Sequence, residues 1–170
     1  MITLRCTRRA AKALGFDLLD SAPPGTSPLG DWYVNLIPTV AGGVYLFVNE
    51  QSLLAVVVPR GEPDLLRQFV ARVGNILSMI GVSNQRIEEE VEHFRDARVA
   101  RTASRKILGV MNEIAFQCQM VLEDATPENK VSISDLELDL AQMPHATLAY
   151  GTPCEVALEL LDSSARYGVS

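Results

Sequence analysis

The sequence predicts an α+β domain, with an antiparallel or mixed sheet of about four to five strands and helices packed mainly on one face. Two observations predict this class. Apolar residues alternate with period two in the segments 31–40 and 44–49, which is typical of strands. From Leu65 onward they recur at steps of three and four residues, which is typical of amphipathic helices. A length of 170 residues suits a single domain, with a core at 1–124 and an acidic connection plus capped helix at 125–170.

The chain opens with a short strand at 2–5 and a first helix. Thr7 can cap this helix through its hydroxyl, and the helix is expected to run to Leu14. Gly15 can end it in a left-handed conformation. Residues 21–30 contain three prolines and two glycines, which indicates a loop.

Three strands are expected to follow, at 31–40, 44–49 and 53–58. The glycines of residues 41–43 favour a hairpin between the first two, because glycine adopts the positive φ of such turns. Residues 53–58 are apolar on both faces, which predicts a central strand covered on both sides.

The rest of the chain is expected to be mainly helical. Helices are predicted at 65–80, 83–94 and 104–124, with a strand at 97–102 and a final helix from Thr152 to Arg166. Ser83 and Ser104 can cap the second and third of these helices. In the second of these helices we expect four glutamates mainly on the solvent side: Glu88, Glu89, Glu90 and Glu92.

Composition excludes several classes of function. A net charge of −6 argues against non-specific nucleic-acid binding by the whole molecule, since phosphate contacts need a positive surface. Cys6, Cys118 and Cys154 have neither the spacing of a zinc site nor that of a disulfide framework. The chain start lacks the apolar run of a secretory signal, and no apolar run approaches the roughly 20 residues of a spanning helix. We therefore expect a cytoplasmic location, no membrane association, no cofactor and no metal.

Catalytic chemistry has little support in the sequence. The chain has two histidines, His93 and His145, and neither belongs to a nucleophile–base motif. No glycine-rich phosphate-binding motif is present. We therefore assign no catalytic residue and favour a non-enzymatic protein.

Two basic segments stand out against the acidic average. Residues 5–12 contain four basic residues before the first acidic residue, and residues 95–106 contain five basic residues against one aspartate. If both segments share a face, an anionic partner can dock there despite the net charge. The alternative is that they pair with the protein's own carboxylates.

The start of the helix at 104–124 is a second candidate, because backbone N–H groups at a helix N-terminus favour anions. Arg105, Gly109, Asn112 and Phe116 follow one another there at helical steps. Mid-helix glycine costs on the order of 1 kcal/mol against alanine. We therefore expect a ligand or another backbone to approach at Gly109.

These features combine into one predicted surface. We expect it to bind a protein partner or an anionic ligand, with nucleic acid less favoured and the oligomeric state left open. The candidate residues are polar, basic or aromatic: Arg5, Trp32, Asn35, Asn49, Arg101, Arg105 and Asn112.

Several motifs resemble a family of small bacterial proteins known only as a domain of unknown function. They are RCT followed by basic residues at 5–9, LGDWYVNL at 29–36, LFVNEQSLL at 46–54, VVVP at 56–59 and LGVMNEIAF at 108–116. The resemblance implies no activity that can be carried over.

Two other functions stay open. One is an enzyme or nucleic-acid-processing protein of a mobile-element, toxin–antitoxin or phage-defence system, using Arg105, Asn112 and Cys6. Residues 143–157 resemble the end of integrase-type transposase domains, but no metal-binding acidic triad can be placed, so we interpret them as a turn and a capped helix. The other is an acidic partner protein that uses the carboxylates of 88–92 or 123–139.

Overall fold

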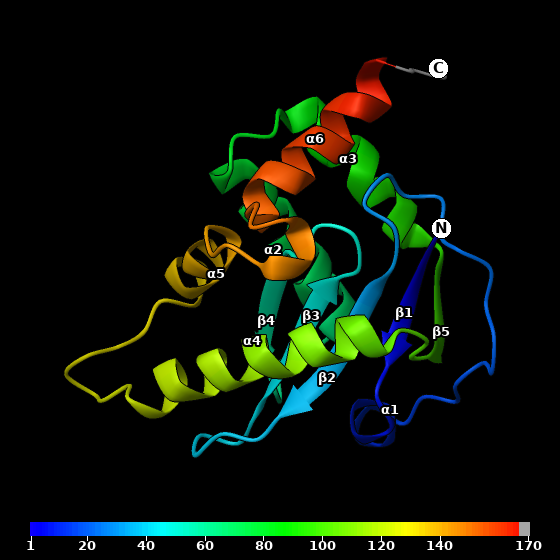
Figure 1. Cartoon of the computed structure of the whole chain (residues 1–170). Coiled ribbons are helices and arrows are strands. Elements are labelled where there is room, and N and C mark those ends of the chain that lie inside the picture. The colour runs from blue at the N-terminus through cyan, green and yellow to red at the C-terminus, as the bar shows by residue number, and fades with distance from the viewer. Residues whose placement is uncertain (167–170) are drawn as a thin grey trace.

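The computed structural model describes residues 1–166, with side chains to residue 162, and contains one five-stranded mixed sheet in that range (Figure 1). The strand order is β4-β3-β2-β1-β5. β1 pairs in parallel with both β2 and β5, whereas β2, β3 and β4 form an antiparallel meander. The strands are β1 (Ile2–Cys6), β2 (Trp32–Ile37), β3 (Val44–Asn49), β4 (Ala55–Pro59) and β5 (Ala97–Arg101).

Helices occupy the segments where they were predicted, and one further helix lies in the acidic stretch after residue 124 that was expected to be a connection. They are α1 (Arg8–Leu14), α2 (Leu65–Met79), α3 (Asn84–Glu92), α4 (Arg105–Glu123), α5 (Ile133–Ala141) and α6 (Pro153–Arg166). The predicted caps are confirmed: the side chain of Thr7 caps α1, Ser83 caps α3 and Ser104 caps α4. Gly15 ends α1 with a φ of 68°.

The interpretation of residues 143–157 as a turn and a capped helix also agrees with the structure. A short 3₁₀ helix, η2 (Ala146–Leu148), precedes α6. The Thr152 hydroxyl accepts a hydrogen bond from the Glu155 N–H at 3.2 Å, and a Glu155 carboxylate oxygen accepts one from the Thr152 N–H at 3.3 Å. This reciprocal pair is a capping box.

Two apolar layers cover the two faces of the sheet. On the first face, Trp32, Phe47 and Phe69 pack together, with contributions from α1, α2, α3 and α6. On the second face, Leu46 and Val57 pack against α4 and α5. In Figure 1, α4 crosses in front of the sheet and α2 lies behind it. The α+β class and the mixed sheet are confirmed. More helices contribute to the first face, and α4 and α5 cover the second.

The strand predicted to be central, β4, is an edge strand. It is apolar on both faces because helices cover both faces of the sheet, which gives an edge strand the composition of a central one. Its open edge is approached by α5, where a Glu137 carboxylate oxygen accepts a hydrogen bond from the Val57 N–H at 2.9 Å. The central strand of the sheet is β2.

The two parallel strands β1 and β5 are followed by helices that lie on opposite faces of the sheet. The chain leaves β1 through α1, which contributes to the first face, and leaves β5 through α4, which covers the second face. In open α/β sheets, the crevice at the carboxyl ends of such strands is the usual place for a ligand. In Figure 1 the carboxyl end of β1 points toward α1.

Candidate functional site

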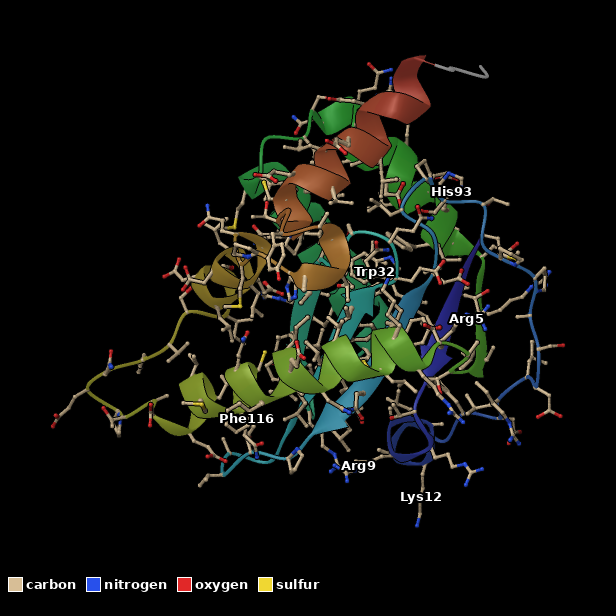
Figure 2. The ribbon with its side chains drawn as sticks, in the orientation of Figure 1. Arg5, Arg9, Lys12, Trp32, His93 and Phe116 are labelled. Carbon is tan, nitrogen blue, oxygen red and sulfur yellow. The ribbon has the colours of Figure 1, made fainter. Side chains whose placement is uncertain are left out.

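Trp32, one of the predicted surface residues, lies in the core. Its side chain is 0% exposed and packs edge-on against the Phe69 ring, with centroids 5.2 Å apart. Figure 2 shows it inside the molecule. The prediction that Trp32 contributes to a binding surface is therefore wrong, because strand alternation turns it toward the helices of the first face.

Asn49 is also fully buried, and the prediction that it lies on the binding surface is wrong. Its amide nitrogen donates to the carbonyls of Leu29 and Asp31 at 2.8 and 3.2 Å. Its side-chain oxygen accepts from the N–H groups of Gln51 and Ser52 and from the Ser52 hydroxyl. Asn49 therefore holds the turn from β3 to β4 and has no capacity left for a ligand.

Arg5 is committed to an internal ion pair. Its side chain is 12% exposed, and its guanidinium contacts the carboxylate of buried Asp31 at 3.2 Å through both Nε and Nη2. Nη1 donates to the carbonyl of Arg101 at 3.4 Å. Asn35 lies on β2, the strand that pairs with β1, and its side-chain oxygen accepts a hydrogen bond from the Thr7 hydroxyl at 2.9 Å. Both residues position β1, β2 and the start of α1.

The predicted line along α4 faces outward. Arg105, Gly109 and Asn112 are exposed, and Figure 2 shows Phe116 on the outer side of the same helix. A Cβ added at Gly109 would meet no atom within 4 Å, so the expected approach of another backbone does not occur there among the described residues. The predicted residues therefore do not form one surface. Trp32 and Asn49 are buried, and Arg5 and Asn35 hold β1, β2 and the start of α1 together. Arg105 and Asn112 lie on the outside of α4.

What the structure does bring together is a hollow at the carboxyl ends of β1 and β5. It measures about 220 Å³ and is lined by residues from three segments of the chain: Cys6, Arg8, Leu18, Arg101 and Thr102. Among the predicted site residues, Arg101 lies here. Arg8 belongs to the basic segment at 5–12. The clustering of charge in the sequence indicated this segment, but it did not indicate which of its basic residues lines the hollow.

The surroundings of this hollow are basic and exposed. Arg8, Arg9 and Lys12 project from α1, and Arg105 and Lys106 begin α4. Figure 2 shows Arg9 and Lys12 pointing away from the sheet. Exposed acidic residues also lie on the nearby segment, at Asp17 and Asp20.

Arg101 forms an ion pair with Asp20, with 2.8 Å between Arg101 Nε and a carboxylate oxygen. The side chains are 56% and 86% exposed, so the pair is weak and screened by solvent. An incoming anion can therefore compete with Asp20 for the guanidinium. Arg8 makes no ion pair with any side chain among residues 1–162.

Cys6 forms an uncharged part of the wall. Burial raises the pKa of its thiol to about 12, so the thiol is protonated at neutral pH. Within the described part of the chain, no group of three or more His, Cys, Asp or Glu side chains is arranged to hold a metal ion.

A second hollow of about 280 Å³ lies near the β2–β3 hairpin. It contains two arginines from different segments, and its lining is Arg9, Leu36, Pro38, Thr39, Gly42 and Arg60. The consecutive residues Arg8 and Arg9 therefore line different hollows. This separation provides a matched control for any experiment on the first one.

Fold and site together define an α+β domain with a basic hollow at the carboxyl ends of two parallel strands. A family model described as a domain of unknown function, DUF6933, matches residues 3–156, and the chain therefore belongs to this family. The resemblance inferred from the motifs is confirmed. No curated protein and no solved structure matches the chain. Of the helices within residues 1–166, none combines the length and apolar character needed to cross a membrane.

Proposed function

We propose that this protein binds a small anionic ligand in the hollow between β1 and β5. The observation that carries the proposal is that Arg8 and Arg101, which belong to different elements, line the same hollow at the carboxyl ends of two parallel strands. Guanidinium groups bind carboxylates and phosphates through paired hydrogen bonds. Thr102 adds a hydroxyl to the same wall.

The alternative, that the basic residues serve only to pair with the protein's own carboxylates, fits Arg5 better than Arg8 or Arg101. Arg5 neutralises a buried aspartate, whereas the Arg101–Asp20 pair is mostly exposed. A positive patch in a protein of net charge −6 also focuses anions toward the patch. These features favour a binding role and assign no reaction.

Calorimetry with two simple probes, acetate and inorganic phosphate, tests this function at low ionic strength. We expect Arg8→Ala and Arg101→Ala each to weaken binding about tenfold or more, because a hydrogen bond to a charged group contributes about 1.5–3 kcal/mol. Arg9→Ala removes the same charge from the adjacent position, and we expect it to change affinity less than about threefold.

Two outcomes would contradict the proposal. One is the absence of measurable binding of either probe to the wild-type protein. The other is an equal loss in the Arg8→Ala and Arg9→Ala variants, which would mean that general surface charge, and not this hollow, attracts the anion.

A further inference from the structure

An apolar cavity adjoins the basic hollow on the first face of the sheet. It measures about 110 Å³, and its walls come from β1, β2, β3, β5, the end of α1 and the start of α2; they include Leu4, Cys6, Leu14, Phe16, Leu66 and Val99. Cys6 lines this cavity and the basic hollow alike, so it is shared by the walls of an apolar cavity and of a cationic hollow.

Strand geometry places the apolar cavity and the basic hollow one after the other along β1 and β5. Ala97, Val99 and Arg101 alternate along β5, so their side chains share one face. On the neighbouring strand, Leu4 is in register with Val99 and Cys6 with Arg101. One step of two residues, about 7 Å, thus leads from an apolar wall to a guanidinium.

The cavity also reaches the surface. Phe16 and Leu66, which line it, are each 40% exposed. Gly15, with its positive φ, turns the chain after α1 so that Phe16 lies at the cavity and Leu19 pairs with β5. Large apolar side chains exposed beside an apolar cavity give a nonpolar chain a route inward.

We propose that the ligand is a small carboxylate with a short apolar chain. The carboxylate lies between Arg8 and Arg101, and the chain passes Cys6 into the cavity. This inference rests on the proposed function, since it assigns a ligand class to the same site.

The size of the cavity limits the chain. A cavity of about 150 Å³ admits benzene, so the smaller space here suits a few methylene groups. A hexanoate chain is a suitable probe, and acetate provides the same charge without the chain. Each methylene that leaves water strengthens binding about three- to fourfold.

Calorimetric titration of acetate, butanoate and hexanoate tests the assignment. We expect hexanoate to bind the wild-type protein at least tenfold more tightly than acetate. Val99→Phe fills the cavity, and we expect it to remove this advantage while leaving acetate binding unchanged. Leu66→Glu changes an exposed helical position, so it keeps the fold; its carboxylate at the cavity mouth is also expected to reduce the hexanoate advantage.

The outcomes separate the two proposals. If hexanoate binds no more tightly than acetate, while both lose affinity in Arg101→Ala, the ligand class is wrong and anion binding stands. The ligand class is also wrong if the advantage of hexanoate survives both Val99→Phe and Leu66→Glu. If none of the three carboxylates binds while phosphate does, the ligand class is wrong and anion binding stands. If phosphate does not bind either, or if the Arg8→Ala and Arg101→Ala variants bind as tightly as the wild-type protein, both proposals fail.

Discussion

Glu90 is a buried carboxyl group on a helix face that was expected to be solvated. It is 1% exposed, its Oε1 accepts a hydrogen bond from the Ser27 hydroxyl, and its Oε2 has no partner among the described residues. Burial raises its pKa to about 7, against the opposing effects of the Ser27 and Leu29 hydrogen bonds. The glutamates of this helix were expected to lie mainly on the solvent side, and Glu90 does not.

This group predicts a pH dependence of folding. The pKa is higher in the folded state than in the unfolded chain, so the folded state binds more protons. The stabilisation is complete below about pH 4.5 and is lost as pH rises through about 7, with a magnitude on the order of 3 kcal/mol. Glu90→Gln stays neutral throughout, so we expect the wild-type protein to lose stability relative to this variant between pH 5 and pH 8.

Urea unfolding of both proteins at several pH values measures the difference. Because Glu137 and His93 titrate in both proteins, subtracting the two curves isolates Glu90. Parallel stability curves across this pH range would contradict the account of Glu90.

At the level of elements, α5 closes the open edge of the sheet at β4. Glu137 is fully buried, and its carboxylate binds the Val57 N–H as well as Nε and Nη2 of Arg72 on α2. Burial raises the pKa of Glu137, opposed by the hydrogen bonds from Arg72 and Val57. One carboxylate thus joins α2, α5 and the free edge of β4, which limits edge-to-edge pairing with other chains.

Glu137→Ala is expected to destabilise the fold by about 3–5 kcal/mol, because it leaves the Arg72 charge and the Val57 N–H without a partner. We also expect faster hydrogen exchange at Val57. Denaturant unfolding and amide exchange measure the two effects. Glu128→Ala, an exposed control, should change stability by less than about 0.5 kcal/mol, and an equally small loss in Glu137→Ala would be incompatible with this role.

Local patterns were enough to predict the elements other than α5, but not the order of the strands in the sheet. Period-two alternation located β2 and β3, and hydroxyl caps located the starts of α1, α3 and α4. The edge position of β4 depends on pairings between distant segments, and its apolar composition depends on helices of both faces. Nothing within residues 53–58 distinguishes such a strand from a central one.

At the level of the whole molecule, the site results from three distant segments. Residues 6–8, Leu18 and residues 101–102 meet because β5 pairs in parallel with β1 and the chain after α1 returns along β5. The sequence showed two basic segments, but it did not determine whether they lie on the same face of the protein. It also suggested Asn49 and Trp32 because polar or aromatic residues in strands look functional, whereas a buried turn and an aromatic core need the same residue types.

The most direct measurement of the central claim is a two-dimensional NMR titration of the labelled protein with acetate. We predict that backbone amide shifts change at residues 6–8, 18–20 and 99–102, which surround the basic hollow. Changes centred on residues 36–42 and Arg60 would instead place the anion in the second hollow. That result, or the absence of any localised change, would contradict an anion site between β1 and β5.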